Sequence, residues 1–399
     1  MTRGTAEVFW VALKLGLSSF GGPIAHLGYF ERTYVRTRHW LTHAELSDLI
    51  ALCQILPGPT SSQVGFLIGH RRAGLPGALA AWAAFTLPSA LLMLACALWA
   101  PLLPPSQMAA IVQGLKLVAV MVVAQALWQM ARVLCPDGPR ALIALLATAA
   151  LLWLPSPWTQ LLVLAAATAL GSGIVRAHAL APRAASSDAA GRGLARISTL
   201  AFATFLVLQA ALLLASRTST THSLLALSAI FYRAGSLVFG GGHVVLPLLR
   251  NALVPGGWIS DDQFLAGYGA AQALPGPVFA FAAYVGALLA PAGAAWLWAS
   301  VALASLFAPG LLLALAGVSV WGWLAQHATA RAALAGLNAA VVGLLAAAFI
   351  DPVCVGAIHQ LRDLAIALAG FLALQRWRVA PLALVLVTVL LSMSIAALR

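Results

Sequence analysis

The sequence predicts an all-α polytopic membrane protein in which two inverted-topology repeats with broken or re-entrant helices are joined by one extra transmembrane helix. Composition is the first observation, since 62% of the 399 residues are hydrophobic and 8% are charged. Soluble domains carry about 25% charged residues, so a water-soluble globular protein is excluded. Long apolar runs and a set of motifs that occurs twice are the other two observations.

The positions of the apolar runs predict how the chain is organised. A polar stretch over residues 178–196 separates two groups of runs. Those before it cover residues 8–27, 44–69, 76–100, 108–133, 140–154 and 158–175. Those after it cover residues 198–216, 223–246, 263–290, 293–320, 332–350, 353–374 and 379–398. Since a membrane span takes about 20 apolar residues, most of these runs are long enough to cross or enter a bilayer. We expect an N-terminal transporter repeat (1–176), a cytoplasmic linker (177–197), a connecting transmembrane helix (198–217) and a C-terminal inverted repeat (218–399).

The distribution of arginine predicts the topology. The formal net charge is +12, and in a membrane protein excess basic residues collect in cytoplasmic loops. This rule places the N-terminus and the linker in the cytoplasm, and it accounts for the charge without a nucleic-acid partner. It also favours hairpins that do not fully cross, because the alternative moves the loop of Arg32, Arg36 and Arg38 outside. That alternative also brings Asp261 and Asp262 inside, and it stays open.

Two motifs recur in the same order and at nearly constant spacing. The run Phe20-Gly21-Gly22 returns as Phe239-Gly240-Gly241, and the run from Gln54 to Pro59 returns as Gln272 to Pro277. Such matches indicate an internal duplication. Each repeat contributes an even number of crossings, so the single helix 198–217 between them inverts the second repeat. Inverted repeats are the architecture of many secondary transporters, whose substrate site lies at the repeat interface.

The repeated motifs predict broken helices within the apolar runs. Proline removes a backbone donor and clashes with the preceding turn, so each Pro-Gly-Pro must interrupt its helix, and the Phe-Gly-Gly runs add further breaks. Free N–H groups at a helix start favour an anion, whereas a purely structural kink is the alternative. The candidate binding residues at these breaks are Phe20, Gly21, Gly22, Gln54, Pro57, Gly58, Pro59, Gly240, Gly241, Gln272, Pro275, Gly276 and Pro277.

Three cations lie inside otherwise apolar runs. Lys14 and Arg233 occupy matching places before the two Phe-Gly-Gly motifs, and Lys116 lies in the fourth run, where the second repeat has Asn338. No acidic residue lies within one helical turn of them in sequence, and a buried unpaired cation costs about 3 kcal/mol or more. We expect these three residues to coordinate an anion. Snorkelling to the membrane interface is the alternative.

Few residues indicate proton coupling, metal or cofactor binding, or catalysis. His26, Glu45 and His243 are candidates for proton coupling, although interfacial histidines are more often polar caps. The four cysteines form no C-x-x-C pair, and neither lysine follows a phosphate-binding G-x-x-x-x-G pattern. No metal or cofactor is therefore expected. The acidic residues are scattered or lie in loops, which disfavours a membrane enzyme that needs clustered carboxylates.

The motifs resemble those of the chromate ion transporter family in its long, two-domain form. They are FGGPIAH (20–26), QILPGP (54–59), FGGGHVVLPLL (239–249) and WISDDQFLAGYGAAQALPGPVF (258–279). The resemblance covers both halves. It implies export of chromate from the cytoplasm across a bacterial inner membrane, chromate resistance, and sulfate as a competing or exchanged oxyanion. Gly242 and Asn338 depart from Pro23 and Lys116 of the first repeat, so the two halves are not equivalent.

The expected function is a secondary transporter that exports a tetrahedral oxyanion by alternating access. The alternatives are an anion channel, or an exchanger of sulfate or another small oxyanion. The expected partners are the anion and the lipid bilayer. The oligomeric state stays open, with a homodimer as one arrangement.

Overall fold

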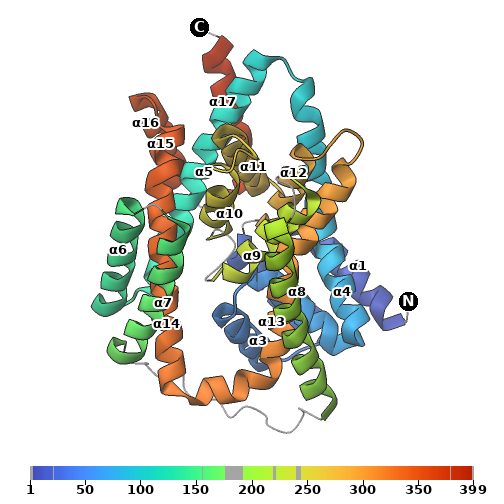
Figure 1. Ribbon diagram of the computed structural model, residues 1–399. Helices are drawn as coiled ribbons and strands as arrows, with labels where there is room; N and C mark the ends of the chain where they lie inside the picture. Colours follow the sequence, from blue (N-terminus) through green and yellow to red (C-terminus); the bar gives the residue numbers. More distant parts are fainter. Residues whose placement is uncertain are drawn as a thin grey trace.

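A computed structural model describes residues 3–20, 22–154, 156–175, 192–218, 222–239, 244–377 and 379–397. Within these ranges all regular elements are helices (Figure 1). The first half contains α1 (Arg3–Ser18), α2 (Gly22–Phe30), α3 (His43–Ile55), α4 (Thr60–Trp99), α5 (Pro105–Leu134), α6 (Gly138–Trp153) and α7 (Pro157–Ile174). A helix α8 (Arg192–Thr218) follows.

The second half of the chain contains the remaining helices. It contains α9 (Leu224–Leu237), α10 (Val245–Leu253), α11 (Asp261–Ala273), α12 (Phe281–Leu288), α13 (Ala295–Gln326), α14 (Ala328–Ala348), α15 (Val355–Ala357), α16 (Leu361–Arg376) and α17 (Pro381–Ala397). A 3₁₀ turn, Val278–Ala280, precedes α12, and π-helical turns cover Glu31–Thr37 and Phe349–Cys354.

Both Pro-Gly-Pro motifs interrupt the helices, as predicted. The first lies between α3 and α4, and the second lies between α11 and the 3₁₀ turn before α12. Gly58 and Gly276 adopt φ values of +127° and +98°, which a residue with a Cβ rarely reaches. The chain therefore uses glycine at the centre of each break and proline on both sides to end one helix and start the next.

One main-chain hydrogen bond connects each break to the other half of the chain. The Gly58 N–H donates to the Val238 carbonyl at 2.6 Å, and the Gly276 N–H donates to the Ser19 carbonyl at 2.9 Å. Ser19 precedes Phe20 of the first Phe-Gly-Gly motif, and Val238 precedes Phe239 of the second. The same contact is thus made in both directions between the halves.

The helices that lead into the breaks begin in the same way. Thr42 and Glu45 form a capping box at the start of α3, and Ser260 and Gln263 form one at the start of α11. A capping box satisfies two backbone donors that the first turn leaves without a helical partner. Figure 1 shows α3 in the lower half of the molecule and α11 in the upper half.

The last two helices of each half pack on a helix of the other half. Helices α6 and α7 contact α14, while α16 and α17 contact α5. Small residues permit close approach: a methyl group on Gly171 of α7 would lie 2.8 Å from the Gly336 Cα of α14. Backbone contact of this kind is typical of helix pairs in membranes, where small residues lie at the interface.

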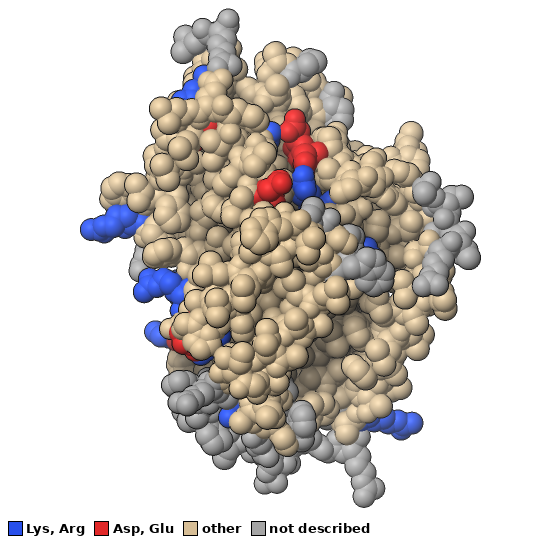
Figure 2. Space-filling model, turned by 60° about the vertical axis from the view of Figure 1, so that its left-hand side comes forward, with Lys and Arg blue, Asp and Glu red and all other residues tan. Residues whose placement is uncertain are grey.

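The surface and the helix lengths fit a bilayer. Among the described residues, five helices are long and apolar enough to cross a membrane: Thr60–Trp99, Ser106–Leu134, Ala195–Ser216, Ala295–Trp321 and Ala328–Ala357. The face in Figure 2 consists mostly of uncharged residues, with charged groups in a few separate places. The chain is an all-α, multi-pass membrane protein.

Several predicted boundaries shift. The run 8–27 is divided between α1 and α2, and the runs 44–69 and 263–290 each contain a Pro-Gly-Pro break. The runs 44–69 and 76–100 meet inside α4, which is non-helical at Ala73 and Gly74, where Gly74 has a φ of +64°. The expected connecting helix (198–217) lies within α8, and most of the expected linker (177–197) lies outside the described residues.

Candidate functional site

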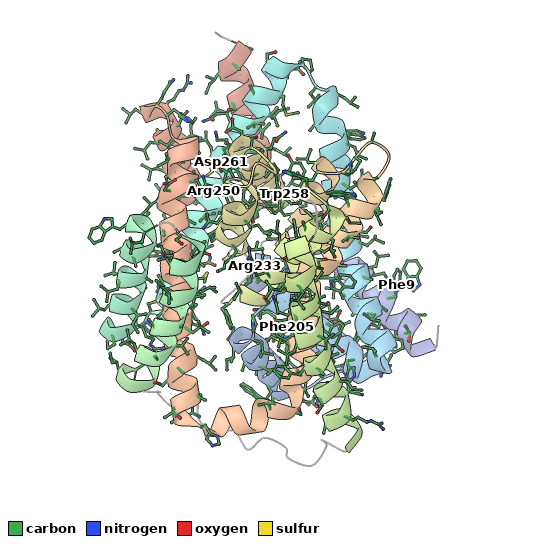
Figure 3. The ribbon with its side chains drawn as sticks, in the orientation of Figure 1. Phe9, Phe205, Arg233, Arg250, Trp258 and Asp261 are labelled. Carbon is green, nitrogen blue, oxygen red and sulfur yellow. The ribbon has the colours of Figure 1, made fainter. Side chains whose placement is uncertain are left out.

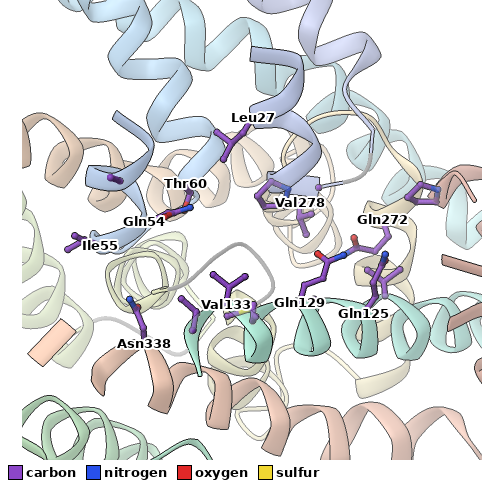
Figure 4. A pocket seen from close by; sticks show the side chains of 18 of the residues that line it. Leu27, Gln54, Ile55, Thr60, Gln125, Gln129, Val133, Gln272, Val278 and Asn338 are labelled. Atoms are coloured by element: carbon purple, nitrogen blue, oxygen red, sulfur yellow. The ribbon is translucent and has the colours of Figure 1, made fainter. Parts of the chain in front are cut away.

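A cavity of about 390 Å³ lies where the two halves meet, beside both broken helices. Helices α3, α5, α11 and α14 contribute most of its wall, and the rest comes from α2, the start of α4, Arg140 on α6, Pro381 on α17 and residues 274–278 around the second break (Figure 4). Its polar and charged lining residues are Gln54, Thr60, Gln125, Gln129, Arg140, Gln272, Arg331 and Asn338. No described carboxylate lines it. The site therefore offers amide and guanidinium donors to a guest.

The glutamines before the two breaks both reach this cavity. Gln54 lies in the last turn of α3 and Gln272 in the last turn of α11. Gln272 is 8% exposed, and its Nε2 atom has no hydrogen-bond partner in the structure. A buried donor without a partner costs about 1–3 kcal/mol, so a ligand oxygen that accepted from Nε2 would be favoured.

The breaks themselves also line the cavity. Gly22 at the start of α2, Thr60 at the start of α4 and Gly276 of the second Pro-Gly-Pro all face it. Thr60 is the first residue of α4, and the first N–H groups of a helix have no acceptor within that helix. Gly22, Gln54, Gln272 and Gly276 thus lie around one cavity, and their part in anion binding stays a prediction.

Sequence reasoning missed part of the lining. Gln125 and Gln129 are one turn apart on α5, and Asn338 lies on α14. An amide repeated at i and i+4 in an apolar helix marks a polar face, and this signal is visible in the sequence. The distribution of arginine places Arg140 and Arg331 on the cytoplasmic side, and it assigns them no part in binding.

The three predicted cations lie elsewhere. Lys14 on α1 and Arg233 on α9 have exposed side chains, and neither lines the cavity. Lys116 on α5 is 6% exposed, and its Nζ atom lies 2.8 Å from Asp262 Oδ1. The expectation that Lys116 is unpaired was wrong, because Asp262 is close in space although far away in sequence.

The remaining predicted residues divide into three groups. Phe20, Pro57, Gly58, Pro59, Pro275 and Pro277 belong to the breaks but do not line the cavity. His26 is 1% exposed, with Nδ1 at 3.1 Å from Ser61 Oγ, and Glu45 caps α3 and pairs with Arg71 at 3.3 Å. Gly21, Gly240, Gly241 and His243 lie outside the described residues.

Several ion pairs occur away from the cavity, around the ends of the hairpins. Arg250 on α10 makes two hydrogen bonds to Asp261 at the start of α11, from Nε at 2.8 Å and from Nη2 at 2.6 Å (Figure 3). In the first half, Glu7 on α1 pairs with Arg38 at 3.1 Å and with Arg72 at 3.0 Å. These ion pairs connect α1 to Arg38 and to α4, and they connect α10 to α11.

The fold and the cavity together define a multi-pass membrane protein with a polar, carboxylate-free site between two interrupted helices. The sequence pattern of the chromate transporter family matches residues 6–172 and 225–393, one stretch in each half. The chain belongs to the chromate transporter family. No solved structure matches it.

Named relatives cover most of the chain. It is 30% identical, over 91% of its length and 87% of the relative's, to a Synechococcus elongatus protein named "Probable chromate transport protein". It is 28% identical to a "Chromate transport protein" of Pseudomonas aeruginosa over 86% of this chain and 80% of that one. It is 26% identical to one of Cupriavidus metallidurans over 85% and 80%.

Proposed function

We propose that this protein exports chromate from the cytoplasm by alternating access and so confers chromate resistance, with sulfate as a competing or exchanged anion. Membership of the chromate transporter family supports chromate as the substrate. The observation that carries the mechanism is the cavity at the two Pro-Gly-Pro breaks, which presents amide and guanidinium groups and no described carboxylate. A bacterial inner membrane with a cytoplasmic N-terminus is part of the proposal.

The cavity chemistry suits a tetrahedral dianion. Chromate and sulfate have four acceptor oxygens, and the lining supplies N–H donors from Gln54, Gln125, Gln129, Gln272 and Asn338. The start of α4 at Thr60 adds backbone N–H groups and a partial positive charge. Hydrogen bonds to a charged partner contribute about 1.5–3 kcal/mol each, and the absence of a lining carboxylate avoids repulsion of the anion.

Alternating access follows from two inverted repeats, over 1–176 and 218–399, that move against each other around a fixed site. Three observations support the inverted arrangement. The family pattern occurs once in each half, the hydrogen bonds Gly58–Val238 and Gly276–Ser19 are reciprocal, and α3 lies in the lower half of the molecule and α11 in the upper half (Figure 1). A single helix, α8, lies between the repeats in sequence and supplies the odd crossing.

Lys14 and Arg233 remain part of the proposal as cations that contact the anion in another state of the cycle. They occupy matching positions in the two halves, and neither lines the cavity in the state described. We expect Lys14→Ala and Arg233→Ala to lower chromate transport at normal protein levels. Normal transport by both variants would remove these two residues from the site.

A negative-inside membrane potential favours the proposed export, with anion exchange and proton coupling as the alternatives. Moving a dianion out of a negative-inside cell releases about 4.6 kcal/mol per 100 mV, twice the value for one charge. The test is flux of labelled chromate in proteoliposomes, with the potential and the pH gradient imposed separately, and with unlabelled sulfate as competitor. Saturable flux that follows the potential is expected. Absence of chromate flux, or a channel-like conductance, would contradict the proposal.

A further inference from the structure

Among the residues that the structure describes, the charged side chains that line the cavity are those of Arg140 and Arg331. We propose that these two side chains form an anion-recruiting site at one mouth of the cavity, where the oxyanion binds before it reaches the amides near the breaks. This inference rests on the proposed transport function and adds a second binding position to it.

The lining residues are spread along the lengths of α5 and α14. Helix α5 lines the cavity from Val122 to Leu134, about 18 Å along its axis, and Arg140 follows beyond the Leu134 end. On α14, Arg331 lies two turns, or about 10 Å, before Asn338. An anion that moved inward from Arg331 would therefore reach Asn338 on α14, and one that moved inward from the Leu134 end of α5 would reach Gln129 and then Gln125.

The arginine mouth is at the linker end of the molecule. Helix α7 ends at Ile174, shortly before the linker, and Gly171 near this end touches Gly336 of α14. Arg331 lies one turn closer to the start of α14 than Gly336 does. The distribution of arginine in the sequence predicts that this end is cytoplasmic. An anion leaving the cell would meet Arg140 and Arg331 first.

The environment of Arg140 suits transient anion binding. A guanidinium is always charged and has planar donors that match an oxyanion. The Arg140 side chain is 17% exposed, and its Nε and Nη2 atoms lie 2.8 Å and 2.7 Å from Asp137 Oδ2. Asp137 also accepts a hydrogen bond from the Arg140 backbone N–H at 3.0 Å and so caps α6. This carboxylate orients the Arg140 guanidinium and offsets part of its positive charge. A dianion bound there is therefore held weakly enough to dissociate.

The first test removes the two charges. Arg140→Gln and Arg331→Gln are compared with Arg132→Gln, an exposed arginine near the end of α5 that does not line the cavity. In inside-out vesicles we expect each cavity variant to raise KM for chromate about tenfold with little change in maximal rate. We also expect a weaker dependence of KM on ionic strength, because salt screens the lost charge. Unchanged KM in both cavity variants overturns the inference.

A second variant separates anion binding from a structural role. Asp137→Asn keeps a good helix cap but removes the carboxylate that offsets Arg140. If Arg140 recruits the anion, this variant lowers KM, opposite to Arg140→Gln. If the pair only supports the fold, both variants lower the amount of protein or the maximal rate, and the inference fails. Wild-type protein without chromate flux would instead contradict the proposed function itself.

Discussion

The Lys116 ammonium on α5 lies 2.8 Å from the Asp262 carboxylate at the start of α11, and this ion pair joins the two halves of the chain. Its partners differ in environment, since the side chain of Lys116 is 7% exposed and that of Asp262 is 68% exposed. Removal of either partner therefore has a different consequence for the other.

Asp262→Asn should destabilise the protein more than Lys116→Gln does. The first change leaves a buried cation without its counter-ion, at a cost of about 3 kcal/mol. The second leaves an exposed carboxylate in water, with a cost below about 1 kcal/mol. Thermal unfolding in detergent measures both, and the double variant should be more stable than Asp262→Asn alone. Equal losses in the two single variants would mean that burial of Lys116 does not control the energetics.

Gly58→Ala and Gly276→Ala should each lower stability by about 2 kcal/mol or more. Both positions have positive φ, and an added methyl group would lie 2.8 Å from Gly310 Cα at position 58 and 2.8 Å from Ser89 Oγ at position 276. Gly28→Ala is the matched control, because nothing lies within 4 Å of a methyl group there. Size-exclusion profiles and melting temperatures check the expectation, and wild-type values for both variants would refute it.

A carboxylate introduced into the cavity should repel the substrate. We expect Gln54→Glu and Gln272→Glu to raise KM for chromate at least tenfold at neutral pH, because a like charge within the site opposes a dianion. Gln107→Glu, on an exposed part of α5 away from the cavity, makes the same chemical change without this effect. The measurement is initial chromate flux against concentration. Equal KM in all three variants would remove the amides from the binding site.

Glu45 gives the hairpin end a pH dependence. The Thr42 N–H donates to its carboxylate at 2.8 Å and Arg71 lies 3.3 Å away, and these partners hold the pKa of Glu45 below its usual range. A lowered pKa means that the ionised form stabilises the fold above the unfolded-state pKa, and that this contribution is lost as pH falls through the folded-state value. Glu45 is therefore ionised at neutral pH.

Glu45→Gln should thus lower the free energy of unfolding at pH 7 by less than about 1 kcal/mol, which lowers the melting temperature slightly. At acidic pH the substitution should have no effect. Asp48→Asn is the control, since Asp48 is an exposed acid of the same helix that makes no ion pair with a described residue. A Glu45→Gln effect that persisted at acidic pH would show that the charge is not its cause.

The sequence was sufficient for the helical membrane class and for both breaks. Proline and glycine act locally, so Pro57 to Pro59 and Pro275 to Pro277 predict interruptions without knowledge of their neighbours. Gln54 and Gln272 could be placed near one another because the motifs are duplicated. These are properties of short segments and of their repetition.

Contacts between distant residues could not be predicted in the same way. Lys116 has no acid near it in sequence, yet Asp262 pairs with it after α5 and α11 have packed together. The distribution of arginine predicts only that Arg140 is cytoplasmic, but the packing of α6 beside α14 brings it to the cavity. Only tertiary structure determines which of several arginines line a given space.

The packing of α6 and α7 on α14, and of α16 and α17 on α5, has a consequence for how such proteins are assembled. Each stretch that matches the family pattern packs its last two helices on a long helix of the other stretch. A protein built from only one such stretch would have to obtain this packing surface from a second polypeptide. Fusion of two stretches in one chain, as here, guarantees equal amounts of both partners and makes their association independent of concentration.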